Sequence, residues 1–332
     1  MAPAGLLEHA VASTGIVGSS QMSFQGLARL GARKHLNLIS LQKWDQQLGG
    51  LKISLHAAAA ATAPGRNNLT LGALAATAPA PELDASTQDN LKRAVARKAV
   101  ELVKSGMIVG LGTGSTASMA IEELGKLISQ NKVKDVVGVA TSYQSRVLAR
   151  QFGVKTVDLN DVNHIDVAFD GADEVDASMN LIKGGGAAHT MEKVVDSIAK
   201  QCVILIDQTK VVPELGLTFP LPVEVLPFAL SPVLRALVGL GGVPEIRNAL
   251  RKDGPVITDL GNMVVDVRFL EGIKNPAELE NKINMIPGVI ENGLFINIAH
   301  KVLVATKDGD ETAIVELADF VASLKSAKEA ST

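Results

Sequence analysis

The sequence predicts an α/β protein in which a doubly wound, largely parallel, Rossmann-like sheet carries an inserted smaller α+β domain. Between residues 107 and 206, short apolar segments alternate with segments of helical periodicity, which is the pattern of parallel strands joined by helices. Five prolines between residues 213 and 232 then interrupt this pattern. The segment that follows has the order strand, helix, strand, strand, helix, strand, which is typical of a ferredoxin-like fold.

The alternating segments define the core sheet. We expect strands at residues 107–111, 136–140, 165–169 and 202–206, with a further strand returning at 301–305. Ser86, with Asp89 three residues later, predicts the start of the first helix, and Gly106 predicts its C-terminal cap. Further helices are expected through residue 128, at 142–152, at 190–200 and at 313–324.

Two domains follow from this pattern. Residues 85–212 and 300–326 make the larger α/β domain, and residues 213–299 make the small α+β domain. In the small domain we expect helices at 233–238 and 277–283 and strands at 264–269 and 289–297.

The first 84 residues differ in composition from the rest. They hold six of the 32 basic residues but only four of the 35 acidic ones, and they are rich in Ala, Ser, Thr and Gly. A basic, hydroxylated and acid-poor segment is typical of an organelle transit peptide, and we predict a plastid address, the chloroplast stroma, over a mitochondrial one. A disordered tail or a poorly defined extra domain is the alternative interpretation.

The overall composition excludes several classes of function. A net charge of −3 and an aromatic content of 3% argue against nucleic-acid binding, which needs a basic field and stacking rings. No apolar run is long enough to span a membrane, although 47% of the residues are hydrophobic. A single cysteine excludes a disulfide framework and a multi-cysteine metal site. The remaining expectation is a protein that acts on a small molecule.

The first candidate motif lies between a predicted strand and a predicted helix. It consists of Gly112, Thr113, Gly114, Ser115 and Thr116. Glycines let the backbone approach an anion, and the N–H groups of the helix start point toward it. The stretch also fits a dinucleotide pattern, but that site needs an acid at the end of the next strand, where residues 141–142 are Thr and Ser. A monophosphate site is therefore favoured over a dinucleotide site or a ligand-free turn.

The second motif follows the strand predicted at 165–169. Asp170 and Asp173 flank the small pair Gly171 and Ala172, which would let a ligand lie close to the backbone between two carboxylates. Magnesium binding, acid–base chemistry and a solvated loop all remain open for such a segment. We expect the neighbouring Glu174 and Asp176 to be ordinary solvated charges.

The third motif combines a lysine, a glycine run and an acid. Lys183 precedes Gly184, Gly185 and Gly186, and consecutive glycines make a donor-rich nest for a carboxylate, a phosphate or an oxyanion. Lys183 can neutralise charge that develops on an oxygen. Glu192, in the following helix, could transfer a proton if partly desolvated, or could be an exposed helix charge.

These three motifs, in this order and spacing, resemble the ribose-5-phosphate isomerase family of type A, in its plant plastid form. The resemblance covers nearly all of residues 86–326. It implies interconversion of D-ribose 5-phosphate and D-ribulose 5-phosphate through an enediolate, in the pentose phosphate pathway and the Calvin cycle. It further implies no metal, no organic cofactor, and a homodimer or homotetramer.

The resemblance also implies roles for individual residues. Glu192 would be the base, Asp170 and Lys183 would handle hydroxyl protons and the oxyanion, and Asp173 would help to open the furanose ring. The remaining residues implied in substrate binding are Thr113, Gly114, Ser115, Thr116, Gly171, Ala172, Gly184, Gly185, Gly186 and Lys210. Which of Lys183 and Lys210 meets the phosphate stays open. His164 and His189 are expected to be loop or packing residues, and Cys202 a buried, inert thiol.

Two other functions compete with this one. A non-catalytic sugar-phosphate sensor would keep the glycine nests without needing a base. A CoA-transferase-like enzyme on a related fold would form a covalent thioester at Glu192.

Overall fold

The computed structural model describes residues 84–309 and 311–330, so the predicted leader lies outside these residues except for Asp84. The largest sheet has seven strands in the order β14-β13-β7-β4-β1-β2-β3. The strands are β1 (Ile108–Leu111), β2 (Val137–Ala140), β3 (Lys155–Thr156), β4 (Val167–Asp170), β7 (Cys202–Asp207), β13 (Lys301–Asp308) and β14 (Glu311–Glu316). All neighbouring pairs are parallel except β13 with β14. The predicted fold class is confirmed.

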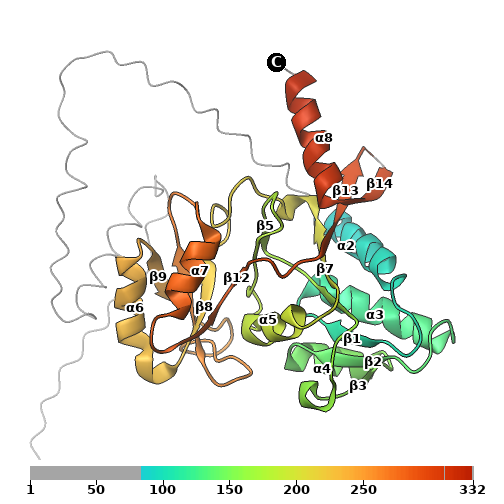
Figure 1. Cartoon of the computed structure of the whole chain (residues 1–332), viewed down its shortest axis with the longest axis horizontal. Helices are drawn as coiled ribbons and strands as arrows, with labels where there is room; N and C mark the ends of the chain where they lie inside the picture. The colour runs from blue at the N-terminus through green and yellow to red at the C-terminus, as the bar shows by residue number, and fades with distance from the viewer. Residues whose placement is uncertain (1–83, 310, 331–332) are drawn as a thin grey trace, which may run out of the picture. The chain divides into compact units, whose positions relative to one another are not determined.

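Helices cover both faces of this sheet, as a doubly wound fold requires (Figure 1). One face packs against α2 (Ala85–Val100), α3 (Ser115–Ser129) and α4 (Tyr143–Gln151). The other face packs against α5 (His189–Ser197) and α8 (Leu317–Ala330). Within residues 84–309 and 311–330, no helix has the length and apolar character needed to cross a membrane.

The strand order reverses between β1 and β4. The chain runs outward from β1 to β2 and β3 on one side, and from β4 to β7 and β13 on the other. In open α/β sheets such a switch point leaves a crevice beyond the carboxyl ends of the two strands, and ligands bind there. The first two sequence motifs follow β1 and β4, so the topology brings them together.

The small domain has the predicted ferredoxin-like order. Its elements are β8 (Leu221–Val225), α6 (Leu230–Gly239), β9 (Val243–Ile246), β10 (Met263–Arg268), α7 (Pro276–Asn284) and β11 (Val289–Asn292). The sheet order is β11-β8-β10-β9, and every neighbouring pair is antiparallel. The domain boundaries at residues 212 and 300 stay a prediction.

Several predicted element boundaries were wrong. Asp84, not Ser86, is the N-cap of α2, because its carboxylate accepts the N–H of Thr87 at 2.9 Å; α2 ends at Val100, well before Gly106. The helix predicted at 313–324 begins only at Leu317, since residues 311–316 pair with β13 as an edge strand.

A third, small sheet was not foreseen. The strand predicted at 289–297 breaks after Asn292, and its second part, β12 (Leu294–Phe295), pairs with β6 (Leu181–Ile182). The third strand of this sheet is β5 (Glu174–Val175). The sheet carries the chain from β4 to the glycine run, and so it sets where Lys183 lies.

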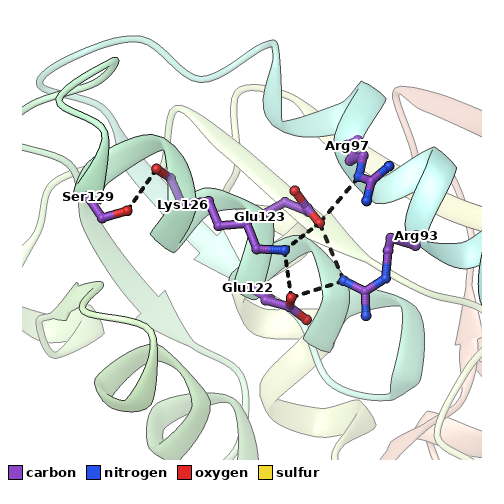
Figure 2. A network of polar contacts seen from close by, with 6 residues as sticks. All are labelled: Arg93, Arg97, Glu122, Glu123, Lys126 and Ser129. Carbon is purple, nitrogen blue, oxygen red and sulfur yellow. Dashed lines mark hydrogen bonds and ion pairs between the residues drawn. The ribbon is translucent and has the colours of Figure 1, made fainter.

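An ion-pair network fixes α2 against α3 (Figure 2). Arg93 of α2 contacts Glu122 at 3.0 Å and Glu123 at 3.4 Å, and Lys126 contacts the same two carboxylates at 2.7 and 3.0 Å. Hydrogen bonds from Lys126 and Arg93 help to hold the pKa of Glu122 below its ordinary value. The network matters for the site because α2 contributes residues to it.

Candidate active site

A cavity of about 220 Å³ lies at the switch point, beyond the ends of β1 and β4. The predicted site residues that line it are Thr113, Gly114, Ser115, Thr116, Gly171, Ala172, Asp173, Lys183, Gly184, Gly185, Gly186, Glu192 and Lys210. Asp170 does not line the cavity, because it is completely buried beside it. The structure therefore brings all three motifs, and Lys210, to one place.

The loop after β1 is shaped by its glycines and its hydroxyls. Gly114 has φ +100 and is the N-cap of α3, and no side chain of the described residues caps this helix start. A Cβ at Gly112 would lie 2.3 Å from Oδ1 of Asp170, so only glycine fits there. The first amides of α3 are consequently free to bind an anion.

Thr113 is held from the neighbouring strand. Its hydroxyl lies 2.8 Å from the hydroxyl of Thr141 and donates to the hydroxyl of Ser142 at 2.7 Å. Thr141 and Ser142 stand where a dinucleotide-binding fold would carry its ribose-binding acid. Here they hold Thr113 in the loop after β1 instead, which agrees with the preference for a monophosphate site.

Lys183 is at the centre of a buried cluster of charges. Its Nζ lies 2.9 Å from Oδ2 of Asp170 and 3.3 Å from Oε2 of Glu192, and it donates to the carbonyl of Gly171 at 2.7 Å. The backbone amides of Thr113 and Gly171 donate to Oδ1 of Asp170 at 3.1 and 2.7 Å. Asp170, Lys183 and Glu192 are each at most 3% exposed. One cation is thus shared by two carboxyl groups in a site of low dielectric constant.

Burial changes the proton affinities of this cluster. Burial raises the pKa of Glu192 to about 8, and the charges of Asp170 and Asp173 add to this effect, while Lys183 opposes it. Burial also raises the pKa of Asp170 against the effect of Lys183. Burial alone would lower the pKa of Lys183, but its acidic neighbours hold it above its ordinary value. Lys183 is therefore charged, and Glu192 can hold or release a proton near neutral pH.

The glycine run forms the opposite wall. Gly184 has φ +107, and a Cβ there would lie 2.8 Å from Nδ1 of His189. The amide of Gly185 donates to Oδ2 of Asp173 at 2.8 Å, which ties the run to the second motif. Gly184 needs glycine, because a side chain would be strained at its positive φ. At Gly185 a Cβ would lie 2.8 Å from Oδ1 of Asp173, so a side chain there would displace this carboxylate.

Comparison with known proteins identifies the family. A family profile described as ribose 5-phosphate isomerase A (phosphoriboisomerase A) matches residues 137–309. Ribose-5-phosphate isomerase A of Thermosynechococcus vestitus is 57% identical over 214 residues, which are 64% of this chain and 90% of that protein. The protein of the same name from Trichodesmium erythraeum is 52% identical over 224 residues, 68% of this chain and 94% of that protein. This chain belongs to the ribose 5-phosphate isomerase A family.

Solved structures of the family agree with the fold. Ribose 5-phosphate isomerase A from Methanocaldococcus jannaschii is 47% identical, with a TM-score of 0.65, and covers 69% of this chain and 99% of its own. A D-ribose-5-phosphate isomerase in complex with phospho-erythronic acid is 42% identical, with a TM-score of 0.66 and coverage of 69% and 98%. The resemblance inferred from the motifs is confirmed, and the chain is an isomerase.

Sequence analysis missed two residues of the isomerase cavity. Gln88 and Lys92, four residues apart on α2, both line it. The amide nitrogen of Gln88 donates to Oδ2 of Asp207 at 3.1 Å, at the end of β7. The spacing of four places both side chains on one helix face, but only the packing of α2 shows that this face meets the cavity.

Asp196 was also missed. It follows Glu192 by one turn of α5 and is 1% exposed. Burial and then the charge of Asp170 raise its pKa well above the ordinary value. Asp196 is therefore a buried carboxyl group that binds its proton more tightly than an exposed aspartic acid does.

The expectation that Glu174 is a solvated charge was wrong. Glu174 is completely buried, and its carboxylate accepts the amides of Gly216, Thr218 and Phe219 at 2.6, 2.7 and 2.7 Å. The hydroxyl of Thr218 adds a further bond at 2.5 Å. Glu174 thereby fixes the segment that leads from the core into the small domain. Asp176, in contrast, is partly exposed and caps its own turn through the amides of Ser178 and Asn180.

The two histidines and the cysteine are placed as expected. His189 is completely buried in the first turn of α5, and burial, reinforced by the charges of Lys193 and Arg247, lowers its pKa to about 3. His164 lies at the surface beside Asp166. Cys202 is completely buried at the start of β7, and burial raises its pKa. Over residues 84–309 and 311–330, no group of three or more His, Cys, Asp or Glu side chains is arranged to hold a metal ion.

Proposed function

We propose that this isomerase interconverts D-ribose 5-phosphate and D-ribulose 5-phosphate with Glu192 as the base that moves a proton between the two carbons. The supporting observation is the position of Glu192, which lines the cavity while its carboxyl oxygen lies 3.3 Å from the Lys183 ammonium. A base that must accept and return the same proton works best with a pKa near the working pH, and burial raises the pKa of Glu192 to about 8.

Lys183 and Asp170 would serve the oxygens of the substrate. The enediolate carries negative charge on oxygen, and a buried ammonium beside it stabilises this charge strongly because water is excluded. Asp170, 2.9 Å from Lys183 and buried behind the cavity wall, would hold the ammonium in place. Asp173 lines the same cavity and would assist ring opening.

The phosphate would bind at the other end of the cavity. The uncapped start of α3 presents the amides of Ser115 and Thr116, and Lys92 and Lys210 line the cavity with them. A helix N-terminus with lysines is a typical phosphate site. Lys183 is committed to the buried cluster, so we assign the phosphate to Lys92 and Lys210.

Turnover of ribose 5-phosphate by the purified chain, in the presence of EDTA, tests this function. We expect ketose formation without added metal, and we expect Glu192→Gln to lower kcat by about 10²–10⁴-fold while phospho-erythronic acid still binds. The amide keeps the shape of the carboxyl group but cannot accept the proton. Binding without turnover in the wild type would indicate a sensor, and a thioester at Glu192 would indicate a transferase.

We also propose that the enzyme works in the chloroplast stroma, where the reaction serves the Calvin cycle. The basic, acid-poor composition of residues 1–84 supports a transit peptide, and the similar relatives from cyanobacteria support a plastid ancestry. Import into isolated chloroplasts, followed by N-terminal sequencing, tests this proposal. An unprocessed chain that stays outside the organelle would contradict it.

A homodimer or homotetramer is the assembly that we propose. Large apolar side chains of the small domain support it, because Phe228 is 99% exposed and Met285 is 80% exposed. Exposed apolar side chains of this size favour association. Size-exclusion chromatography with light scattering of the wild type and of Phe228→Glu measures the assembly.

A further inference from the structure

A side chain of the small domain forms hydrogen bonds with the backbone of the glycine run (Gly184, Gly185 and Gly186) in the active site. Arg247 follows β9, and its Nη1 donates to the carbonyl of Gly184 at 2.8 Å and to the carbonyl of Gly185 at 3.2 Å. Arg247 does not line the cavity itself, whereas both glycines do. The guanidinium therefore lies behind the cavity wall.

Arg247 is itself held firmly. Asp266 of β10 accepts from its Nε at 2.9 Å and from its Nη2 at 2.5 Å, which is the two-pronged geometry that favours arginine over lysine. The backbone of Arg247 is fixed as well, because its amide donates to Val264 at 2.9 Å and its carbonyl accepts from Val256 at 2.8 Å. The chain from Asp266 through Arg247 to the glycine carbonyls is thus continuous and anchored in a sheet.

The glycine run needs such support. Glycine loses more conformational freedom on ordering than any other residue, and three glycines follow one another here. On the cavity side the run is tied by the amide of Gly185 to Asp173. On the far side, Nη1 of Arg247 donates to two successive carbonyls, and so it fixes the peptide planes that join Gly184 to Gly185 and Gly185 to Gly186.

We propose that Arg247, oriented by Asp266, is a positioning residue that holds the glycine run in the geometry required for isomerisation. This inference rests on the proposed function. The small domain then contributes to catalysis through Arg247, although the Arg247 side chain does not touch the substrate. A wall that is misplaced by about 1 Å can lower the rate about 10²-fold, because the reacting groups lose their alignment.

Replacement of Arg247 by methionine tests the proposal. Arg247→Met keeps much of the apolar stem but removes the fork, and we expect kcat to fall by about 10–100-fold. Inorganic phosphate should inhibit the variant as well as it inhibits the wild type, because the phosphate end at α3 is untouched. Phospho-erythronic acid, which adds a carboxylate beyond the phosphate, should bind about 10-fold more weakly by calorimetry.

Three companion variants separate positioning from folding. Arg247→Lys should recover only part of kcat, and Asp266→Asn should act in the same direction with a smaller loss. The double variant Arg247→Met with Asp266→Asn should be no slower than Arg247→Met alone, because both changes break one chain of contacts. Lys282→Met, which removes an exposed cation of α7 paired with Glu278, is the matched control and should keep wild-type values.

The proposal is overturned if Arg247→Met keeps kcat and the affinity for phospho-erythronic acid within twofold of Lys282→Met. A loss of phosphate and phospho-erythronic acid binding to the same degree would also overturn it, since that marks general unfolding of the site. If Arg247→Met does not fold, Arg247→Lys and Asp266→Asn give the same comparison. If the wild type lacks isomerase activity, the proposed function fails. The affinity of Arg247→Met for phospho-erythronic acid, measured by calorimetry, still tests the role of Arg247.

Discussion

The ammonium nitrogen of Lys183 lies 3.3 Å from the carboxyl oxygen of Glu192 that is proposed to carry the proton. The same nitrogen lies 2.9 Å from Asp170, so the base and a second carboxyl group compete for one cation. When Glu192 is protonated, Lys183 is free to serve a developing oxyanion; when Glu192 is a carboxylate, Lys183 stabilises it. The geometry thus couples the charge of the base to that of the substrate.

The pH dependence of the reaction follows from the pKa of Glu192. Burial, together with Asp170 and Asp173, raises this pKa to about 8, and only the carboxylate can accept a proton. We therefore expect kcat/KM to rise with pH, about tenfold per unit below pH 8, and to level off above it. A pH–rate profile with ribose 5-phosphate measures this limb. A profile that is flat between pH 6 and pH 9 would contradict the assignment.

Stability should depend on pH in the opposite direction. The pKa of Glu192 is raised from 4.5 in the unfolded chain to about 8, so the folded state binds more protons between these values. The contribution of the protonated group is fully present below pH 4.5 and is lost as pH rises through 8. Urea unfolding of the wild type at pH 6 and pH 9 should therefore show a loss of stability that is smaller in Glu192→Gln. Equal losses in both proteins would count against a protonated Glu192.

Replacement of Lys183 should affect both the rate and the pH at which the rising limb of the pH–rate profile levels off. Lys183→Met removes the cation that stabilises the oxyanion, and we expect kcat to fall by about 10²–10³-fold. Because Lys183 also lowers the pKa of Glu192, the limb should move to higher pH. Kinetics over a pH series measures both effects, with a thermal melt to verify folding. Loss of rate with an unmoved limb would mean that the two groups are not coupled in solution.

The three motifs could be predicted from sequence because each is local, and because the ends of parallel strands meet at one edge of a sheet. Glu174 and Asp176 show where this reasoning stops. The two acids are two residues apart in sequence, yet Glu174 is completely buried in β5 and Asp176 caps a turn, because only Glu174 faces the segment at residues 216–219. Lys92 and Arg247 escaped prediction for the same reason, since helix packing and the small domain bring them to the site.

Asp196 should act as a neutral group. Its carboxyl group is buried, and burial together with the charge of Asp170 raises its pKa well above the ordinary value. Asparagine has nearly the shape of a protonated aspartic acid, so Asp196→Asn should keep kcat within about threefold and leave the pH limb of Glu192 in place. An ionised Asp196 would instead raise the pKa of Glu192, and the variant would shift the limb to lower pH. The pH–rate profile of Asp196→Asn distinguishes the two states.

Glu174 should matter for stability more than for chemistry. Its carboxylate is completely buried and accepts three backbone amides and a hydroxyl. In Glu174→Gln an amide NH₂ would face these donors, and we expect the free energy of unfolding to fall by about 3 kcal/mol, since bonds to a charged group contribute about 1.5–3 kcal/mol each. Urea unfolding measures the loss, with the exposed Glu245→Gln as the matched control. A difference below about 1 kcal/mol would show that the buried bonds are replaced by other contacts.

The phosphate assignment can be decided by comparing two lysines that line the cavity from different elements. Lys92 lies on α2, and Lys210 ends the short turn after β7. Each loses a charge-assisted contact when replaced by methionine, and we expect KM for ribose 5-phosphate to rise about 10-fold or more in each variant while kcat changes little, because the phosphate does not react. Inhibition by inorganic phosphate should weaken by the same factor, since that probe occupies the phosphate end alone. A variant that instead lost kcat with unchanged phosphate inhibition would place its lysine at the reacting carbons, and Lys183 would then be the phosphate ligand.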